Sequence, residues 1–230
     1  MTVALTVLII FCLAALITYF SPWFWRQRKT RAIRRSVREN RLLALTYDDG
    51  PSERMTPRIL DVLKREGVTA TFFLLGRNAT QHPDLVDRIV HEGHEVGCHS
   101  DQHLNAWKVL PTSANRDIDQ GYSRLERWMR PDGIFRPPFG KMTLATFLSL
   151  RQRRATTWWW TIDSGDTHIE LPKPRTVVER VQKDGGGIVL MHDLDRTADR
   201  DDFVLETTIS LLNLAKVEQL SVVTLSRLDQ

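Results

Sequence analysis

Short apolar runs rich in β-branched and aromatic residues recur along the chain from residue 42 onward, and segments with helical periodicity separate them. The pattern predicts strands at 42–47, 69–75, 94–98, 133–136, 156–162, 187–191 and 220–225. It predicts helices at 57–66, 83–92, 113–130, 142–152, 174–184 and 202–217, the first of them capped by Thr56. This alternation indicates an α/β domain with a parallel sheet, which a doubly wound sheet and a barrel both satisfy.

The chain begins with a different pattern, an uncharged apolar run of eighteen residues from Val3 to Phe20. As a helix this run spans about 27 Å, close to the thickness of one hydrocarbon core. Aromatic residues typical of a membrane interface follow at Tyr19, Trp23 and Trp25. A cleaved signal peptide fits less well, because no Lys or Arg precedes the run and no A-x-A-like site follows it. We therefore expect three parts: a single-pass transmembrane anchor at 1–25, a basic juxtamembrane linker at 26–40 and a domain at 41–230.

Charge is unevenly distributed along the chain, which has a net charge of +4. Seven Lys and Arg residues between positions 26 and 38 and one acid at Glu39 give the first 39 residues a net charge of +6, so the rest of the chain carries −2. A nucleic-acid-binding face on the domain is therefore not expected. The side of a membrane span richer in Lys and Arg tends to stay in the cytoplasm, which places 26–230 there. Two cysteines, one of them within the apolar run, exclude a disulfide framework.

Polar residues gather directly after the predicted strands, where the ligand sites of parallel α/β domains lie. Five clusters occupy these positions: TYDDGP at 46–51, HSDQH at 99–103, RPPFG at 136–140, DSGD at 163–166 and LMHD at 190–193. Each cluster alone is compatible with an ordinary turn or a solvent-facing loop. Five of them in the strand-to-helix loops of one small domain indicate a single functional site.

The residue types in these clusters suit a hydrolytic metal site. His99 and His103 are four residues apart and can converge on one ion, and an aspartate completes a three-ligand set with an open position for water. Of the two adjacent aspartates in the first cluster, one can bind the metal and the other can accept a proton. Arg136 would lower the pKa of the free aspartate. His192 would protonate a leaving amine, kept charged by an aspartate of the DSGD cluster.

The five motifs, in this order, resemble the NodB-homology polysaccharide deacetylases of carbohydrate esterase family 4, over about residues 40–225. The resemblance implies a distorted (β/α) barrel of seven or eight units and hydrolysis of N-acetyl groups on amino sugars. It also implies one divalent metal ion, usually zinc, with cobalt or nickel as alternatives. The implied roles are Asp48 as base, braced by Arg136; Asp49, His99 and His103 as metal ligands; the Phe139 N–H as oxyanion donor; Leu190 and Tyr47 at the substrate; and His192 as general acid, tuned by Asp166.

The sequence leaves two classes of substrate open. Thr167 follows Asp166 where many polymer-active members of the family carry Trp, so the usual wall of the substrate groove differs. This difference and the charge bias favour a lipid-linked or nucleotide-linked amino sugar on the cytoplasmic face, with removal of an acetyl or formyl group. The habit of the family favours a polysaccharide outside the cytoplasm.

Two other functions are compatible with part of the sequence. An iron oxygenase with two histidines and one carboxylate would use His99, Asp101 and His192, and it would leave Asp48, Asp49 and Arg136 without a role. A membrane-tethered saccharide-binding module without activity would be expected to lack the base or a metal ligand. The chain contains all of them.

Overall fold

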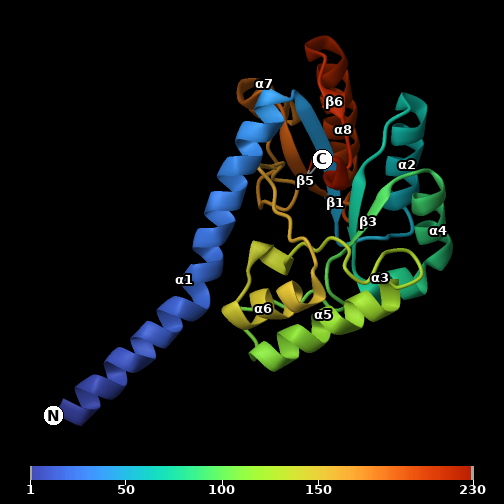
Figure 1. The fold of residues 1–230 in the computed structure, drawn as a ribbon. Coiled ribbons are helices and arrows are strands. Elements are labelled where there is room, and N and C mark those ends of the chain that lie inside the picture. The colour runs from blue at the N-terminus through green and yellow to red at the C-terminus, as the bar shows by residue number, and fades with distance from the viewer. Residues whose placement is uncertain (1, 229–230) are drawn as a thin grey trace.

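A parallel sheet forms the centre of the computed structural model, which describes residues 2–228 (Figure 1). The strand order is β3-β2-β1-β5-β4, with β6 paired to the start of β1. The strands are β1 (Leu42–Asp48), β2 (Thr71–Leu74), β3 (Glu95–Cys98), β4 (Ile162–Asp163), β5 (Gly187–His192) and β6 (Ser221–Val222). Because all their pairings are parallel, the carboxyl ends of the strands lie at one end of the domain.

The helices lie between and around these strands (Figure 1). They are α1 (Thr2–Glu39), α2 (Met55–Glu66), α3 (Gly76–Gln81), α4 (Pro83–His91), α5 (Pro111–Leu125), α6 (Leu144–Arg153), α7 (Pro174–Asp184) and α8 (Ala198–Glu218). Short 3₁₀ turns occur at Pro138–Gly140 and Leu225–Arg227. The alternation predicted from the sequence is confirmed, although α3 has no counterpart among the predicted helices.

Two single bridges close the sheet into a distorted barrel. Phe135 pairs in parallel with Cys98 at the end of β3 and with Thr157, which leads into β4. The predicted strand at 133–136 is reduced to this bridge, because Pro137 and Pro138 have no N–H with which to continue a ladder. The barrel form of the predicted α/β domain is thereby confirmed.

Alternation along β1 separates the inside of the barrel from its outside. Ala44 packs with the interior cluster that contains Phe73, Trp158 and Ile188, and the side chains of Thr46 and Asp48 follow on the same face. The intervening side chains of β1 belong to the larger core between the sheet and the helices: Leu43, Leu45 and Tyr47. The interior face therefore leads directly to the polar residues at the carboxyl end of β1.

The start of α2 differs from the prediction that Thr56 caps it. The helix begins at Met55, and the Asp195 carboxylate accepts the Met55 N–H at 2.9 Å. Thr56 instead accepts the Ser52 N–H at 2.8 Å and donates to Asp193 Oδ2 at 2.7 Å. The Thr56 prediction is wrong because an aspartate about 140 residues away in the chain supplies the cap, and a local pattern cannot show this.

Helix α1 continues through both the predicted anchor and the predicted basic linker. By length and composition it is able to cross a membrane, and none of its most apolar window is buried. Its second half packs on the domain: the Trp25 ring lies 5.0 Å from Phe147 and 5.2 Å from Trp159, and Val37 is 1% exposed. Pro22 lies inside α1, where it removes a hydrogen bond and accounts for the bend of the helix (Figure 1). Residues 26–39 are thus helical and form part of the wall of the domain.

Two truncations should therefore behave differently. Removing residues 1–20 deletes the exposed apolar half of α1, in which Tyr19 contacts the domain through the Trp107 ring, so we expect a melting temperature within about 3 °C of the detergent-solubilised full chain. Removing residues 1–39 exposes the surface that Trp25 and Val37 cover, and burial of one such side chain contributes about 1.5–3 kcal/mol. We expect this truncation to lower the melting temperature by about 6 °C or more, measured by circular dichroism. Equal melting temperatures would show that residues 21–39 are a dispensable linker.

Candidate active site

The clusters predicted from the sequence meet at the carboxyl end of the barrel. Asp48, the last residue of β1, is in register with His192, the last residue of β5. Two positions earlier on the same faces, Thr46 is in register with Leu190. The two adjacent strands thus place a carboxylate and an imidazole side by side at the mouth of the barrel.

Asp49, His99 and His103 form a compact set of potential metal ligands. Asp49 Oδ1 lies 3.5 Å from His99 Nε2 and 3.3 Å from His103 Nε2, and one ligand atom from each residue lies within 4.8 Å of the others. Asp49 Oδ1 is buried without a hydrogen-bond partner. Two imidazole nitrogens and one carboxylate oxygen that lacks a protein partner fit a divalent ion such as zinc with an open position.

His99 is oriented for this role by the main chain. Its Nδ1 lies 2.7 Å from the carbonyl oxygen of Arg136, and because a carbonyl only accepts, Nδ1 carries the proton. The lone pair of Nε2 then faces Asp49. Burial lowers the pKa of His99 to about 3, so the ring is neutral at physiological pH, as a ligand must be.

The two histidines converge through a bent loop and not through a helical turn. Ser100 and His103 both have left-handed backbone conformations, with φ angles of 70° and 61°. The Ser100 hydroxyl accepts the His103 N–H at 3.1 Å. The Asp117 carboxylate of α5 accepts the N–H groups of Gln102 at 2.7 Å and Leu104 at 3.1 Å. Asp117 therefore fixes the loop that carries the candidate metal ligands His99 and His103, and the sequence carried no signal for it.

Asp48 faces the same site and is held by a fully buried arginine. Arg136 Nη1 donates to Asp48 Oδ1 at 2.7 Å and to the Thr46 hydroxyl at 2.8 Å. Its guanidinium lies 4.2 Å from the Phe73 ring centre. Burial raises the pKa of Asp48, and the charge of Arg136 offsets only part of this rise. Arg136 thus lowers the pKa of Asp48 as expected, but burial raises it by more. Asp48 is therefore more basic than an ordinary aspartate.

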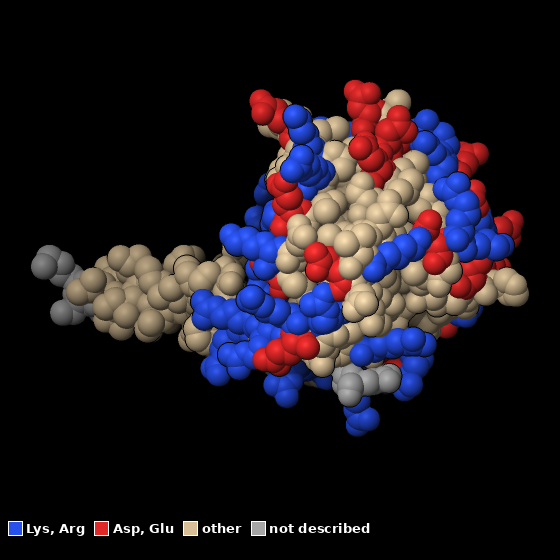
Figure 2. Space-filling model, turned by 90° about the horizontal axis from the view of Figure 1, so that it is seen from above, with Lys and Arg blue, Asp and Glu red and all other residues tan. Residues whose placement is uncertain are grey.

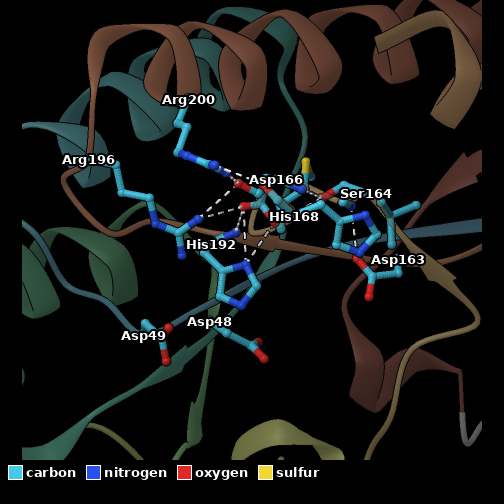
Figure 3. Close-up of polar contacts among 12 residues, drawn as sticks. Asp48, Asp49, Asp163, Ser164, Asp166, His168, His192, Arg196 and Arg200 are labelled. Carbon is cyan, nitrogen blue, oxygen red and sulfur yellow. Dashed lines mark hydrogen bonds and ion pairs between the residues drawn. The ribbon is translucent and has the colours of Figure 1, made fainter. Parts of the chain in front are cut away.

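His192 lies beside Asp48 at the end of β5 and is paired with Asp166 (Figure 3). The His192 ring Nδ1 lies 3.0 Å from Asp166 Oδ1, and the His192 backbone N–H donates to Oδ2 at 2.9 Å. Burial by itself lowers the pKa of His192, but the charge and hydrogen bond of Asp166 raise it to about 9. Asp163, the other aspartate of the DSGD cluster, instead accepts the Gly165 N–H at 2.8 Å. His192 is therefore charged at neutral pH, and Asp166 is the aspartate that holds it.

The Asp166 segment is itself fixed by two arginines from the chain that follows β5 (Figure 3). Arg196 and Arg200 donate to the Asp166 carbonyl oxygen at 3.1 and 2.5 Å. Asp166 is fully buried, and the pKa of its carboxyl is lowered because, against the effect of burial, the charge of His192 and its hydrogen bond favour the ionised form. These contacts keep the imidazole aimed at the mouth of the barrel.

Three further residues were expected at the substrate, and two of them lie at the site. Phe139 is 54% exposed, has a φ of 57°, and its ring lies 4.5 Å from that of His103. Leu190 is buried on β5, two residues before His192. Tyr47 points to the opposite face of β1, where its hydroxyl lies 3.0 Å from that of Thr208. The structure does not bring Tyr47 into the site, because side chains alternate along a strand and Asp48 occupies the inner face.

Asp193 is a buried residue to which the sequence assigned no role. Its N–H donates to the Asp48 carbonyl at 3.1 Å, and its carboxylate packs against Gly50, where a Cβ would lie 2.1 Å from the oxygens. Burial raises the pKa of Asp193 to about 7. Gly50 follows Asp49, so Asp193 fixes the turn that carries this candidate metal ligand. In the sequence, the only sign of a role for Asp193 is its position directly after His192 in the LMHD motif.

The oxygenase set expected as an alternative is not assembled. Arg124 Nε lies 3.1 Å from Asp101 Oδ1, and Gln102 donates to Asp101 Oδ2 at 2.7 Å. Asp101 is therefore engaged by α5 and by its own loop. Among residues 2–228, the single group of three or more close potential ligands is Asp49, His99 and His103.

Comparison with known proteins agrees with this site. The family model described as polysaccharide deacetylase matches residues 35–158. A peptidoglycan-N-acetylglucosamine deacetylase of Bacillus cereus is 34% identical over 155 residues, which cover 66% of this chain and 73% of that protein. Other curated relatives are longer, and the chain spans 37% of one and 54% of another.

Solved structures share the fold of the domain. The crystal structure of a peptidoglycan N-acetylglucosamine deacetylase is similar with a TM-score of 0.74 and 29% identity, covering 83% of this chain and 89% of that one. A pseudoenzyme of carbohydrate esterase family 4 from Bacillus anthracis is similar with a TM-score of 0.72 and 25% identity, covering 84% of this chain and 66% of that one. The fold alone therefore does not distinguish active from inactive members.

The chain belongs to the polysaccharide deacetylase family, the NodB-homology group of carbohydrate esterase family 4. It is thus placed among the hydrolases that act on carbon–nitrogen bonds other than peptide bonds. The resemblance read from the five motifs is confirmed.

Proposed function

We propose that this protein removes N-acetyl groups from the amino sugars of a polysaccharide or a lipid-linked saccharide, using one divalent metal ion. The observation that carries this proposal is that Asp49, His99 and His103 lie at the same end of the barrel as two tuned groups. Asp48, paired with Arg136, and His192, paired with Asp166, end adjacent strands beside these ligands. The names of the relatives, which describe deacetylases of N-acetylglucosamine in peptidoglycan, support the same chemistry.

The residues of the chain divide the reaction between them. A divalent ion on the three ligands, zinc with cobalt or nickel as alternatives, would polarise the amide carbonyl and make water more acidic. Asp48 accepts the proton that the attacking water loses, and the Phe139 N–H donates to the oxygen that becomes negative. His192 donates a proton to the nitrogen as the carbon–nitrogen bond breaks. One water is consumed, and acetate and a free amine are formed.

A complete set of these groups argues against an inactive saccharide-binding module. Such a protein has no need of an aspartate with a raised pKa beside an imidazole with a raised pKa. A carboxylate that can accept a proton, next to an imidazolium that can donate one, is typical of acid–base catalysis.

We further propose that α1 is an uncleaved single-pass anchor. A signal peptide leaves the mature protein, but α1 has no break between its apolar half and the half that packs on the domain. The charge bias of residues 26–38 favours a cytoplasmic domain, whereas the peptidoglycan named for the relatives favours the outer side.

The acid role of His192 predicts a dependence on the leaving group. His192→Ala should slow hydrolysis of an acetamido sugar by about 10²–10⁴, because the amine must be protonated as it leaves. An activated aryl acetate, whose phenolate leaves without a proton, should be slowed much less. Steady-state kinetics with both substrates measure the two factors. Equal slowing of ester and amide would reassign His192 to substrate positioning.

The two tuned groups predict a bell-shaped dependence of kcat/KM on pH. Asp48 must be ionised and has a raised pKa, so the acid limb should lie above the ordinary aspartate range near pH 4. His192 must be protonated, so activity should fall as the pH rises through about 9. In Asp166→Asn the alkaline limb should move toward lower pH, because the charge that raises the pKa of His192 is gone. An alkaline limb that does not move would exclude His192 as its source.

A further inference from the structure

The path of the chain sets the direction in which the site faces. From Pro22 to Glu39, α1 runs along the domain for about 27 Å. The strand β1 then begins at Leu42 and returns over about 23 Å to Asp48. The carboxyl end of the barrel therefore lies at the level where the apolar half of α1 leaves the domain (Figure 1).

Side-chain contacts at this end agree with the chain path. Arg26 Nη1 donates to the Gly140 carbonyl at 3.0 Å, which ties α1 to the turn that carries Phe139. The ring of Tyr19 lies 5.6 Å from that of Trp107, with the two rings edge to face. Tyr19 lies near the end of the apolar run, the position at which the aromatic residues of a membrane span typically meet the interface. Trp107 is four residues beyond the metal-ligand residue His103, so the ligand loop lies at interface level.

The surface around this contact is apolar and carries cations. Trp107 is 40% exposed and Leu110 is 71% exposed, and both lie shortly after the metal-ligand loop in the chain. Lys141 Nζ lies 4.9 Å from the Trp107 ring centre. Arg26 is a second cation beside this surface, where it binds the Gly140 carbonyl. Figure 2 views the domain from above and shows further Lys and Arg side chains beside α1 at the other end of the strands. Apolar side chains flanked by cations are typical of a surface that meets the headgroups of a bilayer.

A recess of about 210 Å³ lies between α1 and the rim of the site. Nine residues line it, of which Arg26 and Lys141 are cations and none is an acid. Trp23 and Trp107 form aromatic walls, and Phe139 separates the recess from His103. The recess is thus suited to an anionic group that lies between the metal ligands and the membrane.

We propose that the substrate is an amino-sugar saccharide joined to a membrane lipid through phosphate, and that this recess receives the phosphate. The inference rests on the proposed function and specifies its substrate class. The sugar lies at the metal ligands, the phosphate lies between Arg26 and Lys141, and the lipid chain remains in the bilayer beside the apolar half of α1. The geometry is the same on either side of the membrane, because it depends only on α1.

The orientation is tested without any activity measurement. In the full chain with Cys12→Ser, the other cysteine is the buried Cys98, so a fluorophore attaches only at an introduced cysteine. Leu110→Cys tests the proposed membrane-facing end. Val217→Cys, 80% exposed near the opposite end of the strands, is the control. In phosphatidylcholine vesicles with a spin-labelled lipid, we expect quenching at position 110 to exceed that at 217 at least threefold. Equal quenching, or stronger quenching at 217, would overturn the inference.

The substrate class is tested with three forms of one N-acetylglucosamine oligosaccharide. It is offered free, with a 1-phosphate, and joined through diphosphate to a polyprenyl chain in vesicles that hold the zinc-loaded full chain. We expect kcat/KM for acetate release to be at least about tenfold higher for the lipid-linked form than for the other two, because enzyme and substrate share one surface. Lys141→Gln should lower the value for the lipid-linked form about fivefold. The matched variant Lys183→Gln, exposed near the other end of the strands, should not change it.

The outcomes separate the two proposals. Equal rates for the free and lipid-linked forms would overturn the inference and leave the proposed function intact. A soluble phosphate as effective as the lipid-linked one would show that the recess binds an anion without a role for the membrane, which also overturns the inference. No acetate from any form, with zinc bound, would overturn the proposed function itself.

Discussion

Asp48→Asn is expected to bind zinc as the unmodified protein does and to release acetate from an N-acetylated oligosaccharide about 10²–10⁴ times more slowly. An amide cannot accept the proton that the attacking water loses. The side chain keeps its shape, and its oxygen can still accept from Arg136 Nη1, which lies 2.7 Å from Asp48 Oδ1 in the native site. The metal ligands Asp49, His99 and His103 are unchanged. The slow step should therefore be chemistry, and the loss should appear in kcat with little change in KM.

A matched control is available at the end of another strand of the same sheet, β4. Asp163 is the last residue of β4, as Asp48 is of β1, but its carboxylate accepts the Gly165 N–H and does not bond His192. Asp163→Asn should keep its activity within about threefold. If Asp48→Asn retains wild-type kcat while melting normally, Asp48 is not the base. If Asp163→Asn loses as much as Asp48→Asn, the loss reports a general disturbance of the strand ends.

His103→Ala is expected to lose both the bound metal and the activity. Its Nε2 lies 3.3 Å from Asp49 Oδ1, and two remaining ligands hold zinc far more weakly than three. His103 is partly exposed at the end of a loop that Asp117 fixes from outside, so the fold should survive the change. Elemental analysis after gel filtration should give less than about 0.1 zinc per chain, against about one for the unmodified protein.

The control for His103→Ala is another histidine outside the site. His91 is exposed at the end of α4, and His91→Ala should keep both metal and activity. A His103→Ala protein that keeps one zinc per chain would contradict the ligand assignment. Loss of metal accompanied by a large fall in melting temperature would be resolved with His103→Cys, which restores a zinc ligand at the same position.

The sequence predicted the site well because ligand residues in a parallel α/β domain follow its strands. Each strand could be recognised from its apolar run, so the residues that follow were known to share one end of the barrel. Tyr47 could have been excluded in the same way. If Asp48 faces inward, alternation turns its neighbour outward, where Thr208 accepts or donates the bond of the Tyr47 hydroxyl.

Other features depend on partners that are distant in the chain, and no local pattern reveals them. Asp195 caps α2 from about 140 residues away, and Asp117 holds the metal-ligand loop from α5. The basic residues after the apolar run read as a solvated linker. In the structure Lys29 and Arg34 donate to the carbonyl oxygens of Thr157 and Thr161, the stretch that closes the barrel. The sheet closes here through single bridges only, because the strands are short and two prolines interrupt the pairing. Lys29 and Arg34 therefore bind carbonyl oxygens at the point where the barrel closes.

The central claim is a hydrolysis that needs one metal ion at Asp49, His99 and His103. The most direct measurement strips the full chain with a chelator, adds zinc in fractions of an equivalent, and follows acetate release from an N-acetylglucosamine oligosaccharide. We predict no acetate without zinc, a linear rise, and a plateau at one zinc per chain. Acetate release from the stripped protein, or a zinc-bound protein that releases none, would contradict the account.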